Sequence, residues 1–430
     1  MRLKSAIRRV RIYIQYHGRH GLFRLISRVA GDVFYTIAVA IYQRYLALFC
    51  PVREAQMVFM STPSFSDNGK ALYEHLLKQK ELEHFHYTWL IHRENMPHWT
   101  PKELTKVVVL DSSWHRGLTF GAMRQVASGK YIFFTHESPM EYMPARDGQH
   151  VINLWHGCGY KDTERKRVVF HQSRQFDVAL VPGPTYVSKK AHFWGCPEEC
   201  ILPLGYPRYD WLLAESESGK RLYQMLKGDA SRLVVWMPTF RKTMGAFFPE
   251  GTIEQCFDLP LLNDESELAK VNQFCRENDL VLCIKRHRRQ IEYSCEKEYY
   301  SNIRFISNRD FIDADVNLYS FLRYTDALIS DYSSAAIDYL LLNRPIAFTL
   351  DDLKRYQETR GFVFENPLDY MPGHHLYGLT DMLTFLGDVS SADDPYKDVR
   401  ARIMPQVHNP CDNYCARIWD AIVNMPEVER

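Results

Sequence analysis

The chain has 430 residues, of which 46% are hydrophobic and 24% charged, and its formal net charge is +1. This composition allows an ordinary core in two or three domains. It argues against a general nucleic-acid binder, because such a protein needs a large basic excess. The cysteines of the pairs Cys196/Cys200 and Cys411/Cys415 are four residues apart and have no Cys-x-x-Cys partner at zinc spacing. We therefore expect reduced thiols and no metal site.

The first 51 residues differ from the rest of the chain in charge. Residues 1–30 contain no acid and eight basic residues, namely Arg2, Lys4, Arg8, Arg9, Arg11, Arg19, Arg24 and Arg28. The longest apolar stretch, Val33–Gln43, has about half the length of a membrane span. A basic amphipathic segment of this kind is typical of a protein that lies on an anionic membrane surface. The alternative is a helix that packs on the protein and keeps its basic face in solvent.

From residue 52 onward, short apolar runs alternate with helical stretches. The predicted strands are Gln56–Ser61, Tyr87–Ile91, Lys106–Leu110, Tyr131–Thr135, His150–Leu154, Val178–Val181, Leu233–Met237, Leu280–Ile284, Ile303–Phe305, Ala327–Ser330 and Pro345–Phe348. The predicted helices are Gly69–Lys80, Leu118–Ala127, Pro184–Phe193, Glu265–Glu277, Leu318–Tyr324 and Ser334–Leu342. Such alternation predicts parallel sheets covered on both faces.

A seam near residues 213–228 divides this pattern into two halves. We predict an α/β fold of two Rossmann-like, doubly wound domains that face a cleft, as in the GT-B type of glycosyltransferase. The predicted parts are a membrane-associating segment (1–51), an acceptor domain (52–215) and a donor domain (216–430), whose last helix could pack back on the acceptor domain. The sequence contains neither a G-x-G-x-x-G nor a G-x-x-x-x-G-K-S/T motif, which disfavours a nicotinamide dehydrogenase and a P-loop kinase.

Polar residues follow several predicted strands, where α/β proteins gather their sites. His156 comes directly after an apolar strand, and Gly157 lets the backbone turn beside it. A neutral histidine can take a proton from an alcohol near pH 7, so His156 is a candidate general base. The alternative is a structural histidine at the end of a strand.

Two further strands are followed by cations. Arg241 lies in Pro-Thr-Phe-Arg after one strand, and Lys285, Arg286 and His287 follow another directly. Clustered cations could stabilise charge on a departing phosphate, and His287 could give that group a hydrogen bond or a proton. The alternatives are a surface arginine and a solvated basic turn.

A serine-rich loop separates the predicted strand Ala327–Ser330 from the helix that follows it. It contains Asp331, Ser333 and Ser334. Ser333 or Ser334 could cap the helix, and the free amides of a helix N-terminus bind phosphate readily. The alternative is a plain cap without a ligand.

In order along the chain, these motifs resemble those of the CDP-glycerol glycerophosphotransferase family of teichoic-acid and capsule synthesis. The matching stretches are Trp155-His156-Gly157 with Lys161, Gly205-Tyr206-Pro207-Arg208, Pro238-Thr239-Phe240-Arg241, Lys285-Arg286-His287, residues 330–338 and Arg360-Gly361-Phe362. They cover residues 55–373. Asn68 lies in a stretch that looks like the family's first helix, on the acceptor side.

The resemblance implies that His156 and His287 are catalytic. The implied donor-binding residues are Arg241, Lys285, Arg286, Asp331, Ser333, Ser334, Arg360 and Gly361, and the acceptor-side residues are Asn68, Gly157 and Lys161. The chain departs from the family where Cys158-Gly159 replaces Thr-Pro, where Arg288 replaces a proline, and at Gly373-His374, where the family tends to have a second proline. These departures concern the choice of polyol and acceptor rather than the reaction class.

The expected function is the transfer of polyol phosphate, most of all glycerol phosphate, from CDP-glycerol or CDP-ribitol to a hydroxyl of a cell-surface glycan or lipid-linked acceptor, with release of CMP. No cofactor is expected, and the enzyme would work peripherally at the cytoplasmic face of the cell membrane. One alternative is a nucleotide-sugar glycosyltransferase with the same fold, which would release a nucleoside diphosphate. The other is a non-catalytic membrane scaffold.

Overall fold

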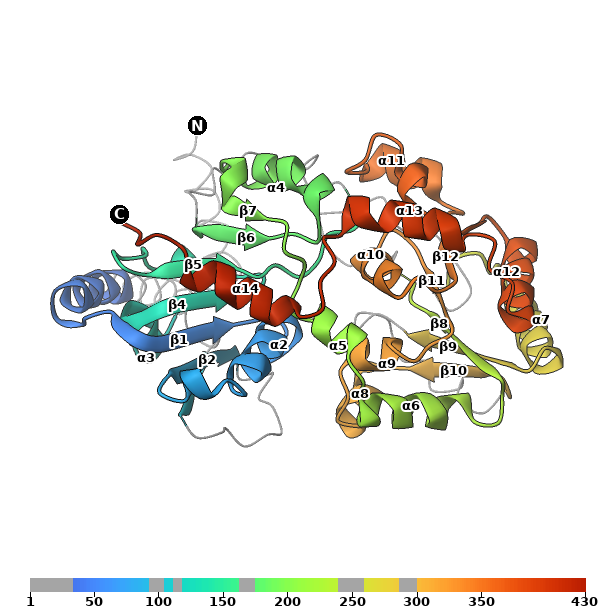
Figure 1. Cartoon of the computed structure of the whole chain (residues 1–430), viewed down its shortest axis with the longest axis horizontal. Helices are drawn as coiled ribbons and strands as arrows, with labels where there is room; N and C mark the ends of the chain where they lie inside the picture. Colours follow the sequence, from blue (N-terminus) through green and yellow to red (C-terminus); the bar gives the residue numbers. More distant parts are fainter. Residues whose placement is uncertain (1–33, 93–103, 111–117, 162–174, 239–258, 286–299) are drawn as a thin grey trace, which may run out of the picture. The chain divides into compact units, whose positions relative to one another are not determined.

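The computed structural model describes residues 34–92, 104–110, 118–161, 175–238, 259–285 and 300–430 (Figure 1). The predicted site residues Arg241, Arg286 and His287 lie outside these ranges, as does most of the predicted basic segment. The domain boundaries predicted at 51/52 and 215/216 stay predictions.

The described strands form two sheets. The order of the first is β3-β2-β1-β4-β5-β6-β7, and the order of the second is β10-β9-β8-β11-β12-β13. The first sheet comprises β1 (Arg53–Met60), β2 (His86–His92), β3 (Thr105–Leu110), β4 (Gly129–Phe134), β5 (His150–Asn153), β6 (Val178–Leu180) and β7 (Ile201–Leu202). The second comprises β8 (Arg232–Trp236), β9 (Leu280–Lys285), β10 (Ile303–Ile306), β11 (Ala327–Ser330), β12 (Ile346–Thr349) and β13 (His374–Leu376).

Both sheets have the strand order of a Rossmann fold, which starts at a central strand, runs to one edge and then resumes on the other side of that strand. The central strand β1 pairs in parallel with β2 and β4, and β8 pairs in parallel with β9 and β11. The order reverses between β1 and β4 and again between β8 and β11. The prediction of two doubly wound α/β halves is therefore confirmed.

Helices connect the strands. They are α2 (Asp67–Leu76), α3 (Phe120–Ser128), α4 (Val187–Trp194), α5 (Tyr209–Leu213), α6 (Glu217–Lys227), α7 (Glu265–Glu277), α8 (Asn308–Asp313), α9 (Leu318–Leu322), α10 (Ser334–Tyr339), α11 (Leu353–Thr359), α12 (Leu379–Ser391), α13 (Lys397–Val407) and α14 (Tyr414–Val423). Several of the long ones begin with a side-chain cap, such as Asp264 before α7, whose carboxylate accepts the backbone N–H of Glu267.

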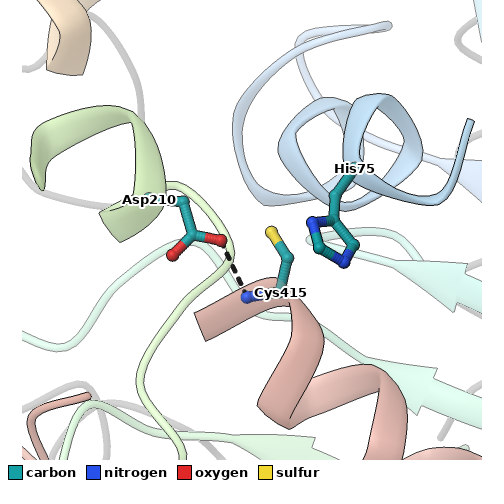
Figure 2. Close-up of side chains that lie close together, drawn as sticks. All are labelled: His75, Asp210 and Cys415. Carbon is teal, nitrogen blue, oxygen red and sulfur yellow. Dashed lines mark hydrogen bonds between the residues drawn. The ribbon is translucent and has the colours of Figure 1, made fainter. Parts of the chain in front are cut away.

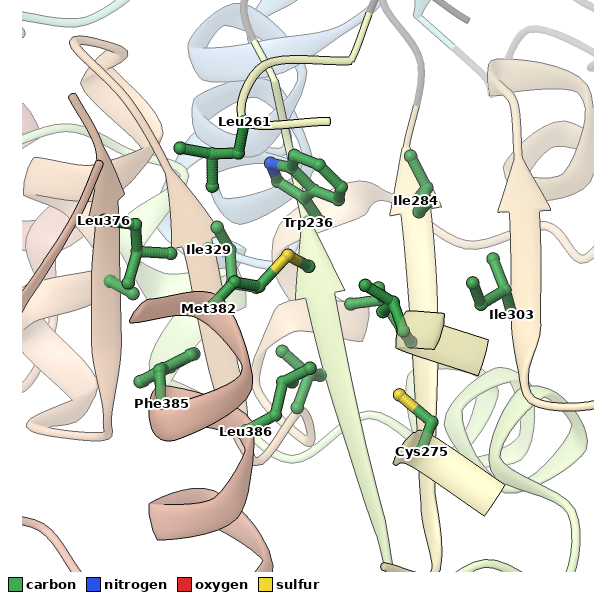
Figure 3. Close-up of a cluster of buried hydrophobic side chains, with 14 of the residues drawn as sticks. Trp236, Leu261, Cys275, Ile284, Ile303, Ile329, Leu376, Met382, Phe385 and Leu386 are labelled. Carbon is green, nitrogen blue, oxygen red and sulfur yellow. The ribbon is translucent and has the colours of Figure 1, made fainter. Parts of the chain in front are cut away.

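A cluster of buried hydrophobic side chains on the second sheet stabilises this half of the chain (Figure 3). Alternate residues of its strands, including Val234, Trp236 and Leu282, lie on one face against the apolar stripes of α7 and α12. The residues between them, such as Leu233 and Val235, are also fully buried. The sheet is thus covered on both faces, as its continuous apolar strands predict.

The chain divides into two compact units that do not coincide with the two sheets. The first contains residues 1–66, 81–152 and 426–430, and the second contains residues 67–80 and 153–425. Asn153, at the end of β5, is therefore the first residue of a long segment that belongs to the second unit. All the predicted site residues that the structure describes lie in this second unit.

Within the first unit, residues 34–49 are helical and present an apolar stripe to solvent. The exposed fractions of Phe34, Ile41 and Leu48 are 75%, 64% and 76%. The opposite side packs on the unit, where Leu46 is buried and the Tyr42 ring meets the Phe120 ring edge-on at 4.9 Å between centroids. Among the described residues, no helix is both long enough and apolar enough to cross a membrane.

Candidate functional site

The loop that carries His156 turns sharply after β5. The Asn153 side chain accepts the backbone N–H of Trp155 at 2.9 Å, as in an Asx turn. Trp155 and Gly157 both adopt positive φ, at 52° and 126°. The Trp155 ring contacts the His156 imidazole, with 4.0 Å between the centroids, and the ammonium of Lys190 on α4 lies 5.0 Å from the Trp155 centroid. The half-buried His156 is therefore held against a fixed aromatic ring.

Two glycines of this loop allow it to pack directly on the start of α10. A Cβ on Gly157 would lie 2.6 Å from the Ser334 Oγ and 2.7 Å from the Arg208 Nη2. A Cβ on Gly159 would lie 2.8 Å from the Ser334 backbone nitrogen and 2.9 Å from the Tyr332 carbonyl oxygen. Neither space can hold a side chain. Gly157 therefore serves this close contact with α10 as well as the turn after β5.

Backbone hydrogen bonds join three of the predicted motifs. Tyr160 donates its N–H to the carbonyl of Tyr332 at 3.4 Å, and Val363 donates to the carbonyl of Tyr160 at 2.9 Å. Lys161 forms an isolated antiparallel bridge with Phe362. The Tyr332 and Phe362 rings pack edge to face, with 5.0 Å between their centroids. Three motifs, separated by up to about 200 residues of sequence, therefore form one cluster: Trp155-His156-Gly157 (WHG), residues 330–334 (SDYSS) and Arg360-Gly361-Phe362 (RGF).

Arg360 and Gly361 end helix α11. Both donate their backbone N–H to the carbonyl of Tyr356, and Gly361 has a φ of 77°, which a glycine adopts without strain. The guanidinium of Arg360 lies 5.8 Å from the centre of the Tyr356 ring. The donor-binding role of both residues stays a prediction, but they now stand beside the loop that contains Ser333.

The SDYSS loop follows β11, next to the point where the strand order reverses. Ligands of doubly wound sheets bind at the carboxyl ends of the strands at this point. Asp331 is fully buried, whereas Ser333 and Ser334 are half-buried, and the Ser333 hydroxyl accepts the backbone N–H of Ala335 as the cap of α10. The capping predicted from the sequence is confirmed for Ser333.

Lys285 ends β9, at the same carboxyl edge of the sheet. Its ammonium donates a hydrogen bond to the Asn308 side chain at 3.1 Å. Burial lowers the pKa of Lys285, because the charged form loses part of its hydration. A partly desolvated cation at this edge gains more from an anionic ligand than a surface lysine does.

A buried ion-pair network holds the WHG loop from behind. The Arg208 guanidinium donates to the carbonyl oxygen of His156 at 2.8 Å, to Asp67 at 2.8 Å and to Asp338 at 2.6 Å. Asp338 also accepts the hydroxyls of Tyr209 and Tyr319, each at 2.6 Å. Arg208 and Asp338 are 2% and 1% exposed, so neither charge could be stable here without the other.

The charges and the burial of the network keep the Arg208 guanidinium and the Tyr209 phenol protonated. Burial works against the charge of Arg208, but Asp338 and Asp67 raise the pKa of this guanidinium well above its usual range. Burial, followed by the Asp338 charge, raises the pKa of Tyr209 well above its usual range. The phenol therefore remains a hydrogen-bond donor and the guanidinium remains a cation.

Asn68 completes the support of the loop. Its amide donates to the carbonyls of Leu154 and Trp155 at 3.2 and 2.8 Å and accepts the backbone N–H of Arg208 at 3.3 Å. The residue is fully buried, so these contacts point to loop positioning. Its predicted place on the acceptor side stays a prediction.

The Arg208–Asp338 pair is the main feature that sequence reasoning missed. Both residues lie in stretches that resemble the family, but nothing in their spacing marks them as partners. A signal was present, because Asp338 is the only acid in the apolar run from Ala335 to Leu342, and an acid at such a position needs a buried partner.

A cavity of about 580 Å³ lies elsewhere, within the first unit. Its lining includes Arg53, His86, Lys106 and Arg124, at the amino ends of β1, β2 and β3 and along α3. None of the predicted site residues line it. Because sites of doubly wound sheets gather at the carboxyl ends of the strands, we place the candidate site at the WHG–SDYSS cluster.

Comparisons with known proteins identify the family of the chain. The model of the family described as CDP-Glycerol:Poly(glycerophosphate) glycerophosphotransferase matches residues 42–424. The teichoic acid ribitol-phosphate polymerase TarK of Staphylococcus aureus is 27% identical over 335 residues, which are 73% of this chain and 58% of that protein. The teichoic acid ribitol-phosphate primase of Bacillus spizizenii is 25% identical, covering 81% of this chain and 85% of that protein.

Among solved structures, the wall teichoic acid polymerase TagF has the same fold. It superposes with a TM-score of 0.69 at 20% identity, over 94% of this chain and 98% of that one. The chain spans about half the length of the two Staphylococcus aureus ribitol-phosphate polymerases that it matches, with 58% of one and 43% of the other.

Proposed function

The chain belongs to the CDP-glycerol:poly(glycerophosphate) glycerophosphotransferase family, and we propose that it transfers polyol phosphate from a CDP-polyol to a hydroxyl of a glycan or lipid-linked acceptor, releasing CMP. The observation that carries this proposal is the packing of the His156 loop on the start of α10, with no room for a side chain at Gly157 or Gly159. This packing holds a candidate base and the candidate phosphate-binding loop in one cluster of the second unit.

In the proposed step, His156 takes the proton of the acceptor hydroxyl. The acceptor oxygen attacks the phosphorus that bears the polyol, a new P–O bond forms, and the bond to the bridging oxygen breaks, so that CMP leaves with the electron pair. Such a transfer depends on in-line positioning and on neutralisation of charge more than on covalent chemistry. We assign this neutralisation to Lys285 and the Ser333–Ser334 loop, together with the predicted Arg241, Arg286 and His287, and the step uses no resident cofactor.

The first experiment is nucleotide release. The purified chain is incubated with a lipid-linked or oligosaccharide acceptor and, separately, with CDP-glycerol, CDP-ribitol and a panel of UDP- and GDP-sugars, each with and without EDTA. CMP formed only from a CDP-polyol supports the proposal, and the better of the two polyols identifies the substrate. A nucleoside diphosphate formed from a sugar nucleotide refutes it, and activity that is lost in EDTA and restored by Mg²⁺ but not by Zn²⁺ refutes the account of charge neutralisation without a metal.

The role of His156 has its own test. His156→Ala should abolish turnover and leave the fold and the binding of the CDP-polyol largely intact, because the base acts on the acceptor. His192→Ala, which removes an exposed imidazole of α4, is the matched control and should keep full activity. Near-normal turnover of His156→Ala would show that the base is another group.

We further propose that the enzyme works at the cytoplasmic face of the membrane, as a peripheral protein. The exposed apolar stripe of residues 34–49 comes shortly after residues 1–30, which contain eight cations and no acid. An apolar helix face beside clustered cations suits an anionic bilayer surface. Sedimentation with anionic vesicles, compared with zwitterionic ones, should be lost in the triple variant Phe34→Ser, Ile41→Ser, Leu48→Ser. It should persist in Met225→Ser, which alters an exposed apolar residue of α6.

A further inference from the structure

Three metal-ligating side chains from three helices converge at a second place in the same unit. His75 comes from the last turn of α2, Asp210 from α5 and Cys415 from the first turn of α14 (Figure 2). One potential ligand atom of each lies within 4.8 Å of the other two. In Figure 2 the Cys415 sulfur lies between the carboxylate and the imidazole, and one ring nitrogen of His75 faces it.

Local structure fixes each of these side chains. The Asp210 carboxylate accepts the backbone N–H groups of Tyr414 and Cys415 at 2.7 and 2.9 Å and so anchors the first turn of α14. Each carboxylate oxygen retains a further lone pair. The Nε2 of His75 lies 3.2 Å from the Gln79 side-chain amide, one turn along the chain. If the Gln79 amide is turned so that its oxygen accepts the Nε2–H, the proton stays on Nε2 and the other ring nitrogen is left to bind, as with the outer-shell acceptors of metal-bound histidines.

Metal binding by these side chains would be coupled to the loss of a proton. A divalent cation would bind the thiolate, release that proton to solvent and neutralise two anionic ligands beside a neutral imidazole.

We propose that His75, Asp210 and Cys415 form a zinc site that ties α2, α5 and α14 together. One sulfur, one imidazole nitrogen and one carboxylate oxygen are a donor set that suits zinc, with water in the fourth position. Neighbouring ligand atoms in such a tetrahedron lie about 3.5 Å apart, so side-chain adjustments of about 1 Å close the site. None of these three ligands is a predicted site residue, so the zinc has a structural role and is a separate matter from the metal requirement of the transfer step.

Metal content tests the proposal directly, on the full chain and without an activity assay. The protein purified without chelators should contain zinc in a one-to-one ratio to the chain. After removal of the metal, Co²⁺ should restore the ratio and give a sulfur-to-cobalt charge-transfer band in the near ultraviolet. Binding should release protons, which a weakly buffered indicator detects. Cys415→Ser and His75→Ala should both lose zinc and the cobalt band.

The controls separate ligation from damage to the fold. Cys196→Ser, the same substitution at a half-buried cysteine outside the cluster, should keep one zinc and the band. Circular dichroism shows whether Cys415→Ser is folded, and this isosteric change should leave the helices in place. A wild-type chain that takes up neither zinc nor cobalt overturns the proposal, and so does a folded Cys415→Ser chain that retains zinc. Either result would identify the cluster as a metal-free contact in which the Cys415 thiol donates to the Pro207 carbonyl at 3.5 Å.

Discussion

Replacing Asp338 with alanine should strongly destabilise the second unit. The substitution leaves the buried Arg208 guanidinium with Asp67 as its remaining carboxylate, and it removes the acceptor of the Tyr209 and Tyr319 hydroxyls. Breaking a buried ion pair from one side costs about 3–5 kcal/mol. Because a folded domain is stable by only about 5–15 kcal/mol, this loss is a large part of the total.

The assay is urea denaturation, and the quantity is the midpoint of the transition that unfolds the second unit. The matched control is Asp313→Ala, in which an exposed partner of Arg309 is removed from a helical i,i+4 pair with 72% and 56% exposed side chains. That change should cost about 0.3–0.5 kcal/mol. The double variant Arg208→Met, Asp338→Leu should recover much of the loss, because it removes both buried charges together.

The same variants report on the His156 loop, because Arg208 binds the His156 carbonyl. Under conditions where Asp338→Ala is still folded, its turnover should fall. If Asp338→Ala destabilises the unit no more than Asp313→Ala does, the account of the network as a strongly coupled buried pair is wrong.

Three other changes have defined outcomes. Gly157→Ala should destabilise the second unit by about 1–3 kcal/mol and reduce turnover, because its Cβ overlaps Ser334 at a positive φ; a fully active, equally stable variant would contradict this packing. Lys285→Ala should weaken CDP-polyol binding by about 10- to 100-fold, the range of a charge-assisted hydrogen bond, and calorimetric titration measures it; unchanged affinity would remove Lys285 from the site. His408 is 1% exposed, and burial lowers the pKa of its imidazole. The unfolded chain therefore binds a proton at this residue more readily than the folded chain does. The free energy of unfolding should accordingly fall as the pH drops below about 6.5. Denaturation midpoints between about pH 7.5 and 5 should therefore change less in His408→Gln than in the wild type, and an equal slope would point to other groups.

The alternating pattern of the sequence predicted the fold well where strands are long and fully apolar. Each of the eleven predicted strands is present, with bounds that differ by at most three residues. The strands β7 and β13, which have two and three residues, were missed because such short runs carry no periodicity of their own. Helices α5, α8 and α11 were missed for the same reason, since one or two turns leave little amphipathic pattern. The longer helices α12 and α13, which follow the last predicted strand, were also missed, and α13 contains a proline, Pro405, that argues against a helix.

The site could be predicted in part. The sequence identified the loops that follow β5 and β11, because polar residues after apolar strands stand out in a parallel sheet. It could not show that these two loops pack on each other. That packing depends on the close approach of Gly157 and Gly159 to the start of α10, which leaves no local pattern in the sequence. It also could not pair Arg208 with Asp338 or bring Cys415 to His75, because partners more than 100 residues apart leave no common local pattern.

The Arg208–Asp338 bond also determines where this chain can be divided. A cut between the two sheets, at 215/216, would look natural from the strand order, yet it would put the guanidinium on one fragment and its carboxylate on the other. The second fragment would keep Asp338 and Tyr319 without the guanidinium, and the first would keep Arg208 with Asp67 but lose the acceptor of the Tyr209 hydroxyl. Fragments made in this way should need each other to fold. Their reassembly on mixing would be a complementation assay, in which compounds that block the contact between the WHG and SDYSS loops can be found.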